Sequence, residues 1–184
     1  MVELIAKPAL GQGVPLRIGR LALEAPDPGV LSWIAPAPGR QGQLAAALRA
    51  AFGFGWPEPG RVLGAGAARL AWFGPGQGML IGPPPPGRLA GAALADQSDA
   101  WVLLRLDGCG VEDALARLVP LDLRPGRFGR GQVARSLLGR VPVVLLRGPG
   151  TAVDLLVPRS MGGSAVALLR RAMAIVAARA RQAE

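Results

Sequence analysis

Three short apolar segments, joined by turns of two and three residues, constrain the fold of this chain more than any other feature. The segments are 133–138, 141–147 and 151–157, and the turns are Gly139-Arg140 and Gly148-Pro149-Gly150. Parallel neighbours need a crossover of a dozen or more residues, whereas antiparallel neighbours need only a tight turn. The sequence therefore predicts an antiparallel meander in the last third of the chain.

Helices and further strands are expected around this meander. Apolar residues recur at helical spacing in the segments 41–52, 111–119 and 161–181. Strands are predicted for 16–24, 30–35, 69–73, 78–81 and 101–106, with 69–81 forming a hairpin. The alternation in 16–24 slips near Gly19, which a bulge would explain, and the Gly- and Pro-rich segment 53–66 predicts a loop. This order predicts an α+β fold, with a mostly antiparallel sheet and helices packed on one face.

The chain is predicted to form a single domain of 184 residues, with two halves at about 1–82 and 88–184. The proline run 83–86 is expected to space the halves. A mean hydropathy of +0.34 is high, yet no run approaches the ~20 apolar residues that a spanning helix needs. The first ten residues lack the pattern of a signal peptide, so a cytoplasmic protein without membrane contact is expected.

The ionisable residues argue against independent catalysis. The chain has no histidine, no tyrosine and one cysteine, Cys109, so a Ser-His-Asp or Cys-His unit is excluded and a zinc site is not expected. The segment Asp107-Gly108-Cys109-Gly110 begins like a dinucleotide fingerprint, but Asp113 occupies the place of the third glycine. We interpret it as a tight turn into a helix, whose first-turn acids Glu112 and Asp113 suit a helix N-terminus. No catalytic, cofactor-binding or metal-binding residue is predicted.

The formal charge of +9 is carried almost entirely by arginine, because Lys7 is the one lysine. Abundant Ala, Gly, Pro and Arg are typical of GC-rich coding sequence, which weakens an inference from charge to nucleic acid. The densest basic stretch comprises Arg124, Arg127, Arg130, Arg135 and Arg140. It suits a solvated edge, a nucleic-acid surface or a protein-docking surface, and for docking we single out Arg127, Arg130 and Arg135.

Several strings in the second half occur together in a fixed order. They are 96–101 (DQSDAW), 120–123 (PLDL), 127–135 (RFGRGQVAR) and 154–160 (DLLVPRS), preceded by Trp72-Phe73-Gly74-Pro75. Together, over about residues 65–175, they resemble the gamma subunit of heterotetrameric sarcosine oxidase. The hairpin string and the Gly-rich turn are also similar to the aminomethyltransferase (glycine-cleavage T protein) family.

The resemblance implies a noncatalytic gamma-type subunit that assembles with alpha, beta and delta subunits and docks on the alpha subunit. The family's complex oxidises sarcosine to glycine with oxygen and passes the methyl carbon to tetrahydrofolate. FAD, FMN and NAD are implied in the alpha and beta subunits and zinc in the delta subunit, with no cofactor on this chain. The implied fold is the N-terminal part of the aminomethyltransferase folate-binding fold.

This chain departs from the related families at two points. Its hairpin continues Gly76-Gln77-Gly78, where relatives more often have acidic and aromatic residues, and no segment matches the motif with the folate-contacting aspartate. Two other hypotheses stay open from the sequence: a stand-alone folate-binding module of the same fold, and a basic RNA-binding protein. Heat on titration with tetrahydrofolate would indicate the first of these, and affinity for RNA that falls steeply with salt would indicate the second.

Overall fold

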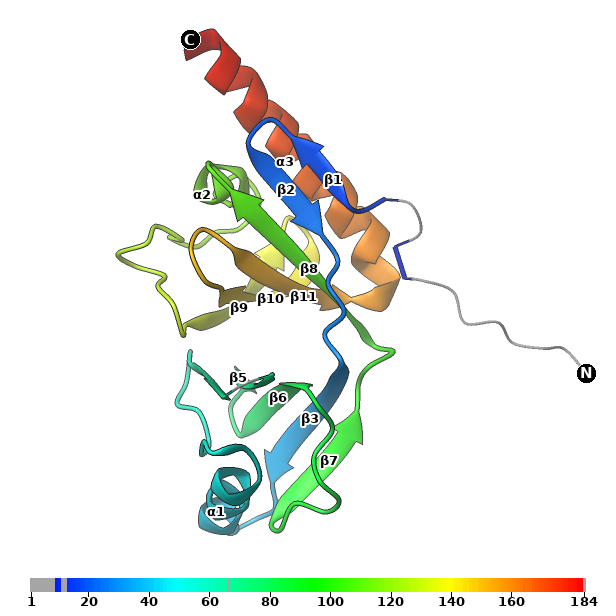
Figure 1. Ribbon diagram of the computed structural model, residues 1–184, viewed down its shortest axis with the longest axis vertical. Coiled ribbons are helices and arrows are strands. Elements are labelled where there is room, and N and C mark those ends of the chain that lie inside the picture. The colour runs from blue at the N-terminus through cyan, green and yellow to red at the C-terminus, as the bar shows by residue number, and fades with distance from the viewer. Residues whose placement is uncertain (1–8, 11–12, 66, 184) are drawn as a thin grey trace, which may run out of the picture.

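Two antiparallel sheets form the centre of the molecule in the computed structural model, which describes residues 9–10, 13–65 and 67–183 (Figure 1). Sheet A has the strand order β1–β2–β8–β11–β10–β9, with bounds Leu16–Ile18, Leu21–Glu24, Trp101–Gly108, Val153–Pro158, Val141–Arg147 and Val133–Leu138. Sheet B has the order β4–β5–β6–β3–β7, with bounds Val62–Ala65, Ala68–Gly74, Gln77–Gly82, Val30–Pro36 and Ala92–Asp96. The helices are α1 (Gln41–Phe52), α2 (Val111–Leu115) and α3 (Gly162–Ala183), with a 3₁₀ turn at Arg159–Met161 before α3.

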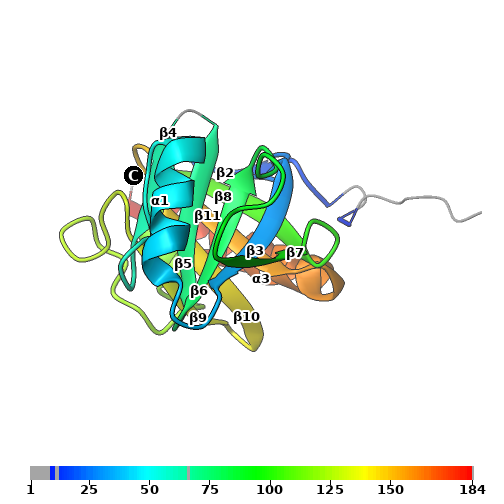
Figure 2. The ribbon, with the colours of Figure 1, turned by 90° about the horizontal axis from the view of Figure 1, so that it is seen from below.

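The elements stack in four layers. The helices α2 and α3 cover one face of sheet A, and α1 covers the far face of sheet B (Figures 1 and 2). Between the sheets lies a third apolar cluster, to which both contribute, for example Leu156 from sheet A and Met79 from sheet B. Each sheet is therefore buried on both faces, which gives this small protein three separate apolar layers.

Burial on both faces explains the near-continuous apolar runs of the central strands. Successive side chains of a strand point to opposite faces. In β11, Val153, Leu155 and Val157 pack under the helices, while Leu156 packs between the sheets. The polar residue Asp154 falls on the same inter-sheet face as Leu156 and is completely buried.

The structure confirms the α+β class and most of the predicted elements. The meander of β9, β10 and β11 is antiparallel, as its short turns require. The helix α1 has the predicted bounds, and Gly53 ends it in the left-handed conformation with φ of 79°. The hairpin of β5 and β6 is also present, closed by Gly76 with φ of 64°.

Four local predictions were wrong. The segment 16–24 is not one bulged strand but the hairpin β1–β2, since Gly19 adopts φ of 58° and reverses the chain. The segment 53–66 is not all loop, because it contains β4. The strand β7 was not expected, and α2 ends at Leu115 rather than near residue 119. The strands also divide between two sheets, each with helices on one face, and do not form a single sheet.

The two sheets interleave along the chain. The hairpin β1–β2 belongs to sheet A, the next five strands make sheet B, and the chain then returns to sheet A through β8. The proline run 83–86 lies between β6 and β7, which both belong to sheet B. The division of the chain into domains stays a prediction.

The long helix α3 packs a stripe of small and apolar residues against sheet A. Its buried positions are Ala165, Val166, Leu169, Ala172, Met173 and Ala177. The segment Arg159–Gln182 contains an 18-residue stretch that is long and apolar enough to cross a membrane, with a mean hydropathy of 1.4 and 39% of the stretch buried. The core helix of a globular protein has the same properties, so this composition is weak evidence for a membrane span. The last turns of α3 project beyond the sheet (Figure 1).

Candidate functional site

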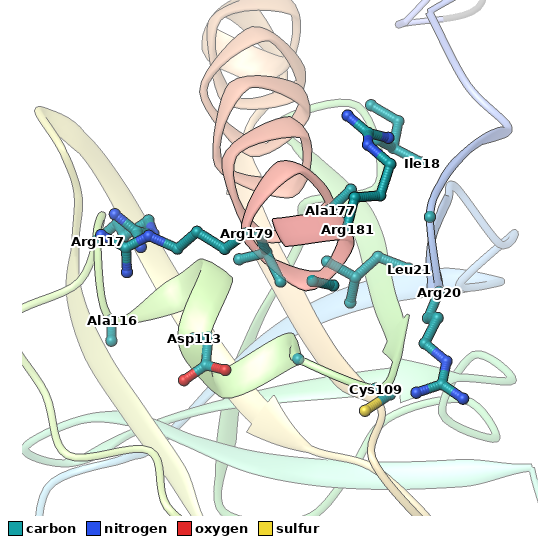
Figure 3. Close-up of a pocket in the computed structure, with 14 residues that line it drawn as sticks. Ile18, Arg20, Leu21, Cys109, Asp113, Ala116, Arg117, Ala177, Arg179 and Arg181 are labelled. Carbon is teal, nitrogen blue, oxygen red and sulfur yellow. The ribbon is translucent and has the colours of Figure 1, made fainter. Parts of the chain in front are cut away.

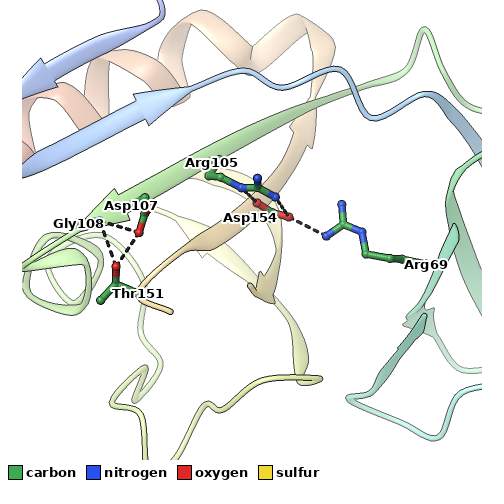
Figure 4. A network of polar contacts seen from close by, with 6 residues as sticks. All are labelled: Arg69, Arg105, Asp107, Gly108, Thr151 and Asp154. Carbon is green, nitrogen blue, oxygen red and sulfur yellow. Dashed lines mark hydrogen bonds and ion pairs between the residues drawn. The ribbon is translucent and has the colours of Figure 1, made fainter. Parts of the chain in front are cut away.

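A buried carboxylate joins the two sheets. The side chain of Asp154 on β11 has no exposed surface, and Arg105 of the neighbouring strand β8 donates two hydrogen bonds to it, at 2.7 and 3.0 Å. Arg69 on β5 reaches the same carboxylate from sheet B at 2.8 Å (Figure 4). The side chains of Arg69 and Arg105 are about a third exposed, at 32% and 33%. One carboxylate thus fixes the position of both sheets in an otherwise apolar layer.

The electrostatics of this network are those of a structural ion pair. The hydrogen bonds from Arg105 to Asp154 raise the pKa of the arginine above its usual value, against a smaller effect of burial in the opposite direction. The guanidinium therefore stays charged at any pH the protein meets. The three hydrogen bonds of the network position the two sheets against each other.

A second ion pair, partly buried, ties α2 to sheet A. Arg147, at the end of β10, is 7% exposed and donates a hydrogen bond to Glu112 of α2 at 2.6 Å. Its Nη1 atom is buried and has no hydrogen-bond partner in the described part of the structure. Glu112 is therefore more than a favourable charge at the start of a helix, whereas its neighbour Asp113 is exposed.

The Gly-x-Gly segment is a tight turn, as expected. Gly108 and Gly110 have φ of 114° and 97°, and a Cβ on Gly108 would lie 2.0 Å from the carbonyl oxygen of Arg20. Asp107 accepts a hydrogen bond from Thr151 at 2.6 Å and one from the backbone of Gly108 at 2.8 Å (Figure 4). The turn holds β8 and α2 together, and it leaves Cys109 exposed.

A cleft opens beside this turn, between α2, the β1–β2 hairpin and the last turns of α3 (Figure 3). Its volume is about 850 Å³. Apolar side chains from the hairpin and from α3 line it, namely Ile18, Leu21, Val176, Ala177 and Ala180. The charged lining residues are the four arginines Arg20, Arg117, Arg179 and Arg181 and one acid, Asp113. The lining of the cleft is therefore strongly basic.

The three arginines expected at a partner interface lie in two different settings. Arg127 and Arg130 are exposed on the loop between α2 and β9. Arg135 lies on β9, where it donates a hydrogen bond to the carbonyl oxygen of Phe73 at 2.7 Å and its guanidinium lies 5.0 Å from the centre of the Phe73 ring. The contact of Arg135 thus links the edge of sheet A to sheet B, and the docking role of all three arginines stays a prediction.

Two features of this region were not found from the sequence. Asp154 is an acid inside an apolar strand, and this pattern indicates a buried partner, since an unpaired buried charge is strongly unfavourable. The cleft brings together Arg20, Arg117 and Arg179 from three distant parts of the chain, so no local pattern reveals it. The described residues contain no group of three or more Cys, Asp or Glu that could hold a metal ion.

The fold defined here is an α+β arrangement of two antiparallel sheets with few helices. Among solved structures, a chain of the heterotetrameric sarcosine oxidase from Corynebacterium sp. U-96, in complex with pyrrole 2-carboxylate, has this fold. The two chains are 25% identical with a TM-score of 0.76, and the match covers 92% of this chain and 91% of that chain. This chain is therefore similar, over nearly its whole length, to a chain of that oxidase.

Other comparisons contribute less. The regulatory subunit of aspartate kinase from Thermus thermophilus is 12% identical with a TM-score of 0.36, over 84% of this chain and 97% of that chain, and a score this low does not indicate a shared fold. No protein-family model matches the chain, and no curated protein matches its sequence.

Proposed function

We propose that this chain is a noncatalytic gamma-type subunit of a heterotetrameric sarcosine oxidase, and that it docks on the alpha subunit. The observation that carries the proposal is the match in fold to a chain of such an oxidase, which covers more than nine-tenths of both chains. A match of that extent is expected when two chains occupy the same place in an assembly. The order of the sequence strings between residues 65 and 175 supports the same subunit.

In this proposal the chemistry belongs to the partner subunits. They bind FAD, FMN, NAD and zinc, and the complex, in the cytoplasm, converts sarcosine to glycine and transfers the methyl carbon to tetrahydrofolate. The side chains of this chain agree with that division of roles. It contains no histidine, and its buried acid Asp154 and partly buried acid Glu112 are each paired with arginine. Such ion pairs hold a scaffold in place and leave its outer surface for contact with other subunits.

The loop between α2 and β9 is a candidate docking surface in this assembly. It presents Arg127 and Arg130 to solvent, and arginine is enriched at protein interfaces. Arg135 lies on β9 and bonds to Phe73 of sheet B, so it is left unchanged in the test of this loop. A charge reversal at Arg127 and Arg130 therefore tests docking without disturbing the contact between the sheets.

Co-expression with candidate alpha, beta and delta chains, followed by size-exclusion chromatography, tests the proposal. The chain is expected to elute with its partners, and persistent elution of this chain alone would refute the proposal. The variant R127E/R130E should weaken assembly more than it lowers the thermal stability of the isolated chain. R40E/R88E is the matched control, because both arginines are exposed and lie near sheet B and α1. Unchanged assembly of R127E/R130E would mean that the loop is merely solvated.

A further inference from the structure

Two sets of arginines in this protein differ in their contacts. Arg69, Arg105, Arg124, Arg135 and Arg147 each bind a carboxylate or a backbone carbonyl of the chain itself. The four arginines of the cleft, Arg20, Arg117, Arg179 and Arg181, are exposed and make no hydrogen bond or ion pair with the described residues. Their charge is balanced in the cleft by Asp113 alone, so the cleft is complementary to a strongly acidic partner.

The floor of the cleft is apolar and is shaped by two glycines. A Cβ on Gly19 would lie 2.9 Å from the Cβ of Ala177, and one on Gly110 would lie 2.9 Å from Cγ1 of Val176. The absence of these side chains lets α3 lie directly against the hairpin and the start of α2. Beyond Ala177 the helix has no buried residue in the described chain, and it forms an overhanging wall (Figures 1 and 3). An apolar floor with charged residues at its rim is typical of a protein–protein interface.

We propose that this cleft receives an acidic-aliphatic segment of a neighbouring subunit, an inference that rests on the proposed function. An aliphatic side chain of that segment lies on the floor formed by Leu21, Val176 and Ala180. Carboxylates on either side of it pair with Arg20 and Arg181 near the hairpin, and with Arg117 and Arg179 near α2. Figure 3 shows these two groups of arginines on opposite sides of the end of α3.

A segment of protein fits these observations better than a small molecule. Sites for small ligands fix orientation through a few polar groups placed inside the pocket. Here the polar groups are the exposed tips of arginine side chains at the rim, and the interior is lined by alanine, valine, leucine and isoleucine. Arginines on both sides of the cleft are matched by several carboxylates along a protein chain. Such carboxylates also steer the association of the subunits.

Charge reversal on α3 tests the inference in the assembled complex. R179E/R181E reverses two charges at the exposed end of the helix, and R170E/R171E makes the same change on the same helix outside the cleft. The cleft variant should weaken association with the co-expressed subunits at least about tenfold, and the control variant should weaken it about threefold or less. Equal effects of the two variants, or no effect of either, would overturn the inference.

The single cysteine provides a second readout. Cys109 is exposed and lines the cleft, so an occupant of the cleft will shield it. Its alkylation by iodoacetamide, followed by mass spectrometry of this chain, should be at least about tenfold slower in the complex than in the isolated chain. If the subunits co-purify and Cys109 reacts equally fast in both states, the cleft is empty in the complex: the inference fails and the proposed function stands.

An experiment on the isolated chain tests the cleft independently of the proposed function. A synthetic peptide of alternating glutamate and leucine should slow the alkylation of Cys109 in the wild type but not in R179E/R181E. If the chain fails to co-purify with the oxidase subunits yet the peptide protects Cys109, the proposed function fails and the acidic-aliphatic specificity of the cleft remains. Protection by phosphatidylglycerol vesicles and not by the peptide would identify a membrane surface, and would overturn the inference. So would an absence of protection by either probe.

Discussion

The stability of the protein should depend strongly on which partner of the inter-sheet ion pair is removed. In the variant R69M/R105M the long aliphatic side chains keep most of their packing, but Asp154 becomes a completely buried carboxylate without its three hydrogen bonds from arginine. An uncompensated buried charge of this kind costs about 3–5 kcal/mol. In D154L, by contrast, the two arginines are a third exposed and can be hydrated, and the new side chain joins an apolar layer. We therefore expect D154L to lower the free energy of unfolding by only about 1–2 kcal/mol.

Equilibrium unfolding in urea near neutral pH measures these differences. The decisive variant is R69M/R105M/D154L, which replaces the whole network by apolar side chains. Because the buried charge is gone, the free energy of unfolding should recover most of what R69M/R105M loses, to within about 2 kcal/mol of the wild type. If the triple variant is no more stable than R69M/R105M, the loss comes from packing of the arginines and the electrostatic explanation is wrong.

Three smaller predictions follow from other contacts. E112Q should lower the free energy of unfolding by about 2–3 kcal/mol, since it leaves the buried Arg147 without a charged partner. D113N, at the exposed neighbour, should change this free energy by less than about 0.5 kcal/mol. Equal losses for the two variants in urea unfolding would contradict this. In thermal unfolding, Gly110→Ala should destabilise the protein by at least about 1 kcal/mol more than Gly39→Ala. Both glycines have positive φ, but only Gly110 lies against another segment. Similar losses would mean that backbone strain alone explains the destabilisation. The hydrogen bond from Arg124 lowers the pKa of Asp122 to about 2 from its usual 3.8. This interaction stabilises the fold at pH values above 3.8, and the stabilisation is lost as the pH falls through about 2. In R124Q an NMR titration should show the pKa of Asp122 return toward 3.8, and a value that stays near 2 would contradict the assignment.

Elements with a strong local pattern were predictable from the sequence. The helix α1 combines apolar residues at helical spacing with Gly53 at its end, and both signals act within the helix itself. The meander was predictable because its turns are too short for any other connection. The α+β class followed from these elements, which do not depend on distant contacts.

The missed elements depend on contacts with distant segments. The strand β7 has the sequence Ala-Ala-Leu-Ala-Asp, which has little intrinsic preference for a strand, and its pairing with β3 supplies the order that the sequence lacks. The division into two sheets is set by which strands pair. In sheet A, β2 pairs with β8, although all five strands of sheet B come between them in the sequence. Neither fact leaves a local signal.

The same distinction applies to the candidate site. The turn at Gly108 and Gly110 was recognised from its glycines. The hydrogen bond from Arg135 to the Phe73 carbonyl was not predicted, because a basic stretch in the sequence does not show which of its arginines face another sheet. The cleft needs the relative positions of α2, α3 and the hairpin, which only the folded chain provides.

The interleaving of the sheets also sets an order of events during synthesis. Sheet B is made from one continuous stretch, residues 30–96, and can be complete while the ribosome is still translating β8. The hairpin β1–β2 is made first but has no partner until β8 emerges, and Leu21 and Leu23, 2% and 0% exposed in the folded protein, stay uncovered at least until then. Exposed apolar strands of this kind are prone to aggregate. The pairing with β8 covers only the edge of the hairpin. Its apolar face stays open until α3, which follows every strand in the sequence, packs against it.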